Sequence, residues 1–102
     1  MSAYFEAVAR NVTDEISHAG PGQRNHALNR ASFALGRVAH LAGSDIDGAL
    51  VRISDAAMSN GLSQIEARAT IGSGFKRGVE NPRTDVAESD RPFEPSAIDR
   101  LC

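Results

Sequence analysis

The chain has 102 residues, which is enough for one domain but leaves little room for a deep enzyme pocket beside the core. Hydrophobic residues make up 41% and aromatic residues 5%, with no Trp, so the core must consist mainly of Ala, Val, Leu and Ile. The formal net charge is −2, the single Cys is the last residue, and no apolar run is long enough to span a membrane. These features exclude a framework of internal disulfides and favour a soluble, cytoplasmic protein without a membrane partner.

Helical periodicity and turn signals predict four helices. The first spans about residues 2–18 and is ended by the turn residues 19–22. The second spans 25–42 and is ended by Gly43. The third spans 45–59, with Asn60-Gly61 as its C-terminal cap. The fourth begins at residues 62–66, where Ser63 and Glu66 have the spacing of a capping box, and it ends before Pro82.

Each predicted helix has one apolar face. The residues expected to point inward are Phe5, Val8, Ala9, Val12 and Ile16 in the first helix, Leu28, Ala31, Leu35, Val38 and Ala42 in the second, Ile46, Ala49, Leu50, Ile53 and Ala57 in the third, and Ile65, Ala69, Gly72, Phe75 and Val79 in the fourth.

No segment alternates like a strand, so the sequence predicts an all-α fold, a compact four-helix bundle over residues 1–83. Residues 84–102 contain five acids, two Arg and two Pro, and we expect a flexible, disordered acidic tail. Within this tail, Phe93 to Leu101 has a few apolar residues that could dock on a partner.

The glycine-rich stretch Ile71-Gly-Ser-Gly-Phe-Lys-Arg-Gly78 invites interpretation as a phosphate-binding loop. Its glycines do not have the spacing of a dinucleotide fingerprint or a P-loop, and a capped helix rather than a strand precedes them. We therefore expect these glycines to serve helix packing, with Gly72 on the inward face.

The second helix indicates a binding surface. At 100° per residue, His26, Arg30, Phe33, Arg37 and His40 form one polar stripe opposite the apolar face, and residues 24–41 contain no acid. Arg can hold phosphate oxygens with two donors, which suits nucleic-acid contact. Phe33 could stack on a base, but because large aromatic side chains are usually buried we expect it in the core.

A second indication of DNA binding lies at residues 57–63, where Ala57 precedes Gly61 by four residues and a helix cap follows. Helix-turn-helix units have this order, so the third and fourth helices are predicted to form a helix-turn-helix-like pair. The fourth would be the recognition helix, with Gln64 and Arg68 near its start facing the groove.

The sequence offers no catalytic constellation. Asp45 and Asp47 lie in the first turn of a helix, where the helix dipole favours acids, and the three His lack partners at metal-ligand spacing. We expect a protein that is not an enzyme, with no catalytic residues, metal or cofactor.

Residues 22–83 resemble the small helical domain found beside the catalytic part of phage and plasmid DNA primases, of the Toprim type or the primase-polymerases. The matching pattern is Arg24-Asn25, Leu28, Ala31, Gly36, Ala56-Ala57, Gly61-Leu62, Glu66, Thr70-Ile71, Ser73-Gly74, Gly78 and Pro82-Arg83. The resemblance implies a helical bundle that positions template DNA during replication. It does not extend to the catalytic domain of that family, so we expect either a fragment or a stand-alone protein that has taken over the bundle for a regulatory role.

The sequence therefore predicts a non-catalytic DNA-binding domain, either a primase accessory module or a small regulator. The predicted DNA-binding residues are Arg24, Asn25, His26, Arg30, Arg37, Gln64, Arg68, Lys76 and Arg77. The partners would be DNA and a replication or regulatory protein. The alternative is a protein-interaction module that acts through helix faces or the tail.

Overall fold

The computed structural model describes residues 3–83, apart from the side chain of Ser44, and it contains four α-helices. They are α1 (Ala3–His18), α2 (Arg24–Arg37), α3 (Ile46–Ser59) and α4 (Gln64–Val79). The predicted all-α fold is confirmed. The predicted tail over 84–102, including its possible docking segment, lies outside the described residues.

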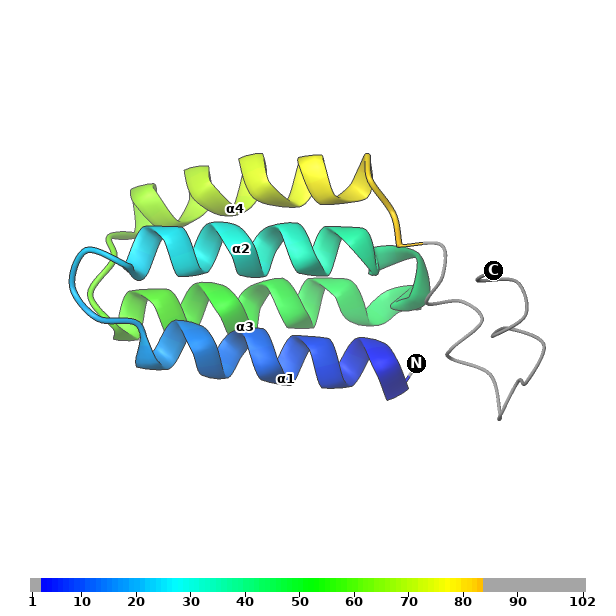
Figure 1. The fold of residues 1–102 in the computed structure, drawn as a ribbon, viewed down its shortest axis with the longest axis horizontal. Coiled ribbons are helices and arrows are strands. Elements are labelled where there is room, and N and C mark those ends of the chain that lie inside the picture. The colour runs from blue at the N-terminus through cyan, green and yellow to red at the C-terminus, as the bar shows by residue number, and fades with distance from the viewer. Residues whose placement is uncertain (1–2, 84–102) are drawn as a thin grey trace, which may run out of the picture.

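The helices run along the long axis of the bundle, with α2 and α3 between α4 on one side and α1 on the other (Figure 1). The chain reverses direction from each helix to the next, so α2 and α4 run parallel to one another. The packing of α4 is mainly against α2 and to a smaller extent against α3. Within residues 3–83 the chain forms no helix with both the length and the apolar character needed to cross a membrane.

The core consists mostly of the predicted inward residues of the first three helices. Phe5, Ile16, Leu28, Leu35 and Ile53 are its largest fully buried side chains, and Ala residues fill the space between the helices. Small side chains let the helix axes approach closely, which explains how a chain with so few aromatic residues encloses an interior.

The predicted second helix, 25–42, is too long. It ends at Arg37, and the connection to α3 is made by two 3₁₀ turns, Ala39–Leu41 and Gly43–Asp45. Val38 and Ala42 are still buried, as predicted, but they lie in or beside the turns. His40 is exposed in the first turn and therefore does not continue the stripe on α2.

The turn between α3 and α4 follows the sequence signals closely. Gly61 has φ +113°, and the amides of Gly61 and Leu62 donate to the carbonyls of Met58 and Ala57, which is a Schellman arrangement. The Asn60 side chain donates to the carbonyls of Ile16 (3.0 Å) and Ala19 (2.7 Å), so this turn also holds the end of α1.

The predicted inward face of α4 is wrong at four of its five residues, since only Phe75 is partly buried and packs against the core. Ile65, Ala69 and Gly72 are exposed, Ile65 to 83%, and Val79 is exposed to 48%. The fully buried residues of α4 are Ala67, Gly74 and Gly78.

The buried face of α4 is explained by two of its glycines, which pack closely against α2: Gly78 against Gly36, and Gly74 against Asn29 and Ser32. A Cβ added to Gly36 would lie 2.8 Å from the Cα of Gly78, and one added to Gly74 would lie 2.9 Å from the Cβ of Ser32. Gly72 has nothing within 4 Å of an added Cβ. The packing role predicted for the glycines is therefore confirmed, but at Gly74 and Gly78 rather than at Gly72.

Candidate nucleic-acid interface

Cations are concentrated on the paired helices α2 and α4. Together these two helices contain six Lys or Arg and one acid, Glu66: the cations are Arg24, Arg30, Arg37, Arg68, Lys76 and Arg77. Helices α1 and α3 together contain five acids and two Arg: Glu6, Asp14, Glu15, Asp47, Asp55, Arg10 and Arg52. Charge is therefore unevenly distributed in this near-neutral chain: the parallel helices α2 and α4 are rich in cations, and helices α1 and α3 are rich in acids.

The exposed stripe predicted on α2 is present up to the end of that helix. His26 and Arg30 are exposed, and Phe33 and Arg37 are half-buried. Arg30 lies toward α1, where its Nη2 is 3.9 Å from Glu15 Oε1, and both side chains are more than half exposed. Such an ion pair is weak, so Arg30 remains available to an anion.

Arg37 is held in place without losing its charge to an acid. Its Nε donates to the Asn81 carbonyl oxygen at 2.8 Å, and its guanidinium lies 5.8 Å from the centre of the Phe33 ring. It forms no ion pair with any residue from 3 to 83. Arg30 and Arg37 therefore share one exposed face and neither is locked into an internal ion pair.

Phe33 lies outside the core, contrary to our expectation from the sequence. Its ring is half-buried, and it is flanked by Arg37 from α2 and by Arg77 from α4, whose guanidinium is 5.4 Å from the ring centre. Arg77 also donates to Asn29 Oδ1 at 3.3 Å. Cation–π contacts of this kind hold guanidinium groups beside an aromatic ring while their donors stay exposed.

Polar side chains continue this surface toward the start of the two helices. Thr70 Oγ1 donates to Asn25 Oδ1. A shallow hollow of about 430 Å³ opens above this pair, lined by Gly22, Asn25, His26, Asn29, Thr70 and Ser73. We call the exposed face formed by Asn25, His26, Asn29, Arg30, Phe33, Arg37 and Arg77 the α2–α4 surface.

The structure brings together five of the nine predicted residues, namely Asn25, His26, Arg30, Arg37 and Arg77, and it places the other four elsewhere. Arg68 precedes Arg77 by nine residues and so lies on the opposite side of α4, while Lys76 is turned 100° away from Arg77. Gln64 is exposed in the first turn of α4, also off this surface.

The remaining predicted residue, Arg24, is half-buried against the α3–α4 turn. Its Nη1 is 3.1 Å from the position of an added Cβ on Gly61, and its Nε is buried without a hydrogen-bond partner.

Asn29 and Thr70 make contacts at this surface and were not among the residues predicted from the sequence. A signal for Asn29 was present, because it follows Asn25 by one helical turn and precedes Phe33 by another. Thr70 could not be assigned without the correct orientation of α4.

On the acidic side of the bundle, one carboxylate is held by an arginine. Arg52 of α3 donates two hydrogen bonds to Glu6 of α1, at 3.2 and 3.3 Å. These hydrogen bonds hold the pKa of Glu6 below its usual value. Among the residues that the structure describes, no three His, Cys, Asp or Glu side chains gather in a group that could hold a metal ion.

The chain matches no protein-family model, and comparisons with curated proteins and with solved structures give no significant match.

Proposed function

We propose that this protein is a non-catalytic DNA-binding helical domain, similar in role to the template-positioning module of primases, and that it contacts DNA through the α2–α4 surface. The observation that carries the proposal is that Arg30, Arg37 and Arg77 lie on one surface shared by two adjacent parallel helices, and that no acid is among the residues of this surface. Arg30, Arg37 and Arg77 are the central residues, because each presents guanidinium donors on the same exposed face.

The surface suits a phosphate backbone better than a small anion. Guanidinium groups bind phosphate oxygens with paired donors, and amide and hydroxyl groups such as those of Asn25 and Thr70 commonly fix the register of a protein on DNA. Arg30 and Arg37 lie about two helical turns apart along α2 rather than together in one pocket, as expected for contacts to successive phosphates. Binding of this kind weakens steeply as salt rises.

A titration of labelled DNA with the double variant Arg30→Ala/Arg37→Ala tests the proposal. Each lost phosphate contact reduces the dependence of log K on log salt by about 0.7–0.9, so the slope should fall by about 1.5 between about 50 and 200 mM salt. Affinity at the lower salt should fall at least about ten-fold.

The matched control is Arg10→Ala/Arg52→Ala, which removes the same charge from α1 and α3. We expect it to change DNA affinity by less than about three-fold, since it acts only through the overall field of the molecule. Thermal melting of both variants shows whether the fold is kept. Equal losses in the two variants would mean that the α2–α4 surface is not the site.

One observation favours a second function, a protein-interaction module. The stripe Ile65, Ala69, Gly72 and Val79 has the regular spacing of a buried helix face, yet within residues 3–83 no other helix covers it. Light scattering and cross-linking of Ile65→Glu beside the unchanged protein test this alternative. A mass that falls from dimer to monomer would support it, and a monomer in both cases would leave DNA binding as the only proposed function.

A further inference from the structure

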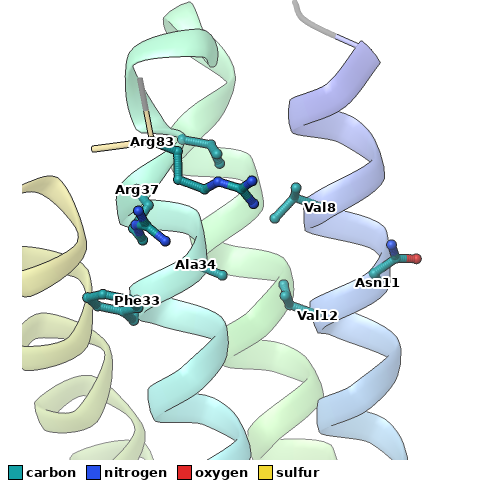
Figure 2. A pocket seen from close by; sticks show the side chains of 8 residues that line it. Val8, Asn11, Val12, Phe33, Ala34, Arg37 and Arg83 are labelled. Carbon is teal, nitrogen blue, oxygen red and sulfur yellow. The ribbon is translucent and has the colours of Figure 1, made fainter. Parts of the chain in front are cut away.

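A cavity of about 270 Å³ lies between α1 and α2, next to the α2–α4 surface (Figure 2). Apolar side chains from both helices form its walls, with polar groups at the rim. It is lined by Val8, Asn11, Val12, Phe33, Ala34, Arg37, Val38 and Arg83. Small-ligand sites commonly combine an apolar interior with a few fixed polar groups in this way.

Arg83 is held across one end of the cavity, where it extends from the segment after α4 toward Val8. Its amide donates to the Arg37 carbonyl oxygen at 2.9 Å. Its Nη1 donates to Tyr4 Oη at 2.9 Å, and its guanidinium lies 5.8 Å from the centre of the Tyr4 ring. The cavity is therefore bounded by a fixed guanidinium, which favours a flat, electron-rich ligand over an aliphatic one.

Two residues belong both to the rim of the cavity and to the α2–α4 surface. These are Phe33 and Arg37, and only one of the Arg37 nitrogens, Nε, donates within residues 3–83. If Arg37 binds the phosphate of a nucleotide, the base of that nucleotide would lie over the mouth of the cavity. In a duplex that base is paired and stacked, whereas in a single strand it is free to turn into an apolar pocket.

We propose that this cavity binds one unpaired nucleobase and that the protein therefore prefers single-stranded DNA. The proposal rests on the proposed function, because it uses phosphate contacts on the α2–α4 surface to deliver the base. The role of Arg37 is to hold the phosphate, and Val8, Val12, Ala34 and Val38 enclose the base.

The test compares three labelled DNAs of equal length: a single strand with bases, a single strand of abasic residues, and a duplex. Insertion of one base should make the full chain bind the normal single strand about ten-fold more tightly than the abasic strand. Ala34 lines the cavity, and Ala34→Leu places three further carbon atoms inside it. It should remove most of this ten-fold difference and leave affinity for the abasic strand unchanged. Ala69→Leu makes the same change at an exposed position and should keep the difference.

The outcomes separate this inference from the proposed function. If the unchanged protein binds normal and abasic single strands equally, or the duplex as tightly as the single strand, the cavity site is overturned while phosphate binding stands. If it binds none of the three DNAs, the proposed function fails as well. If Ala34→Leu weakens binding to normal and abasic strands alike, the cavity does not hold a base. The comparison in the unchanged protein decides the matter even if Ala34→Leu does not fold.

Discussion

Three glycines determine how closely α2 and α4 approach one another. Gly36, Gly74 and Gly78 meet backbone or small side chains where any Cβ would stand, and Ser32, the neighbouring small residue, satisfies its hydroxyl by donating to the Leu28 carbonyl oxygen at 2.8 Å. A glycine inside a helix costs about 1 kcal/mol relative to alanine. Because three glycines are involved, the close contact between the two backbones must offset this cost at each of them.

The pair Gly78→Ala and Gly72→Ala tests this account. An alanine at position 78 would collide with the backbone of α2, and we expect a loss of about 3 kcal/mol or more in the free energy of unfolding. An alanine at position 72 would meet open space and should raise it by about 0.5–1 kcal/mol. Urea unfolding measures both. A stable Gly78→Ala protein would show that α2 and α4 are not packed as described.

This arrangement also explains why the sequence could not identify the inward face of α4. Hydrophobic periodicity favours the stripe with the larger apolar residues, which runs through Ile65 and Val79. The buried face is instead marked by the absence of side chains at Gly74 and Gly78, and a scale of hydrophobicity does not register that absence. Two glycines four residues apart, opposite Ser32 and Gly36 on α2, are recognisable only when the partner helix is known.

Helix boundaries were predictable where a side chain or a special backbone conformation fixes them. The start of α4 is set by Ser63, whose Oγ accepts from the Glu66 amide at 3.1 Å, and the end of α3 by Gly61. The end of α2 carries no such signal. Nothing between Arg37 and Gly43 breaks a helix by its own chemistry, and the 3₁₀ turns there result from the reversal of the chain toward α3.

Replacing Ser63 with alanine should therefore destabilise the protein at one defined helix end. The Glu66 amide would lose its partner, and the free energy of unfolding should fall by about 1 kcal/mol. Ser63→Asp should restore most of that loss, because a carboxylate also accepts from this amide and favours the positive end of the helix dipole. Thermal melting of the unchanged protein and of the two variants measures these differences in stability. If the aspartate variant is as unstable as the alanine variant, the loss does not come from the cap.

At the scale of the whole molecule, the candidate site depends on helices that are separate in sequence. The exposed cations of α2 could be predicted from periodicity alone, and Arg30 and Arg37 lie on one face as expected. The cation that α4 contributes to this surface could not be predicted in the same way. Which of Arg68, Lys76 and Arg77 joins that face depends on the rotation of α4, and the glycines set this rotation by bringing Arg77 beside Phe33. The cavity beside Arg83 is likewise formed by segments about 75 residues apart in the chain.

The charge of residues 84–102 should also affect DNA binding. Residues 84–102 carry five acids and two Arg, so they make the whole chain negative although residues 1–83 carry one more cation than acids. Long-range attraction between a protein and DNA depends on this overall charge, and salt screens it over about 10 Å at about 0.1 M. Changing the five carboxylates to amides moves the formal net charge from −2 to about +3 without a substitution in residues 1–83.

We therefore expect this amide variant of the full chain to bind DNA roughly ten-fold more tightly than the unchanged protein at low salt, with faster association and little change in dissociation. The advantage should shrink to less than about two-fold near 0.5 M salt, because the effect is electrostatic. The substitutions are Asp85→Asn, Glu88→Gln, Asp90→Asn, Glu94→Gln and Asp99→Asn. A control with the three Asp changed to Glu keeps the charge and should bind like the unchanged protein. An increase in affinity that persists at high salt would instead indicate that these residues occupy the DNA site directly, and no increase at low salt would mean that the field of the bundle alone governs association.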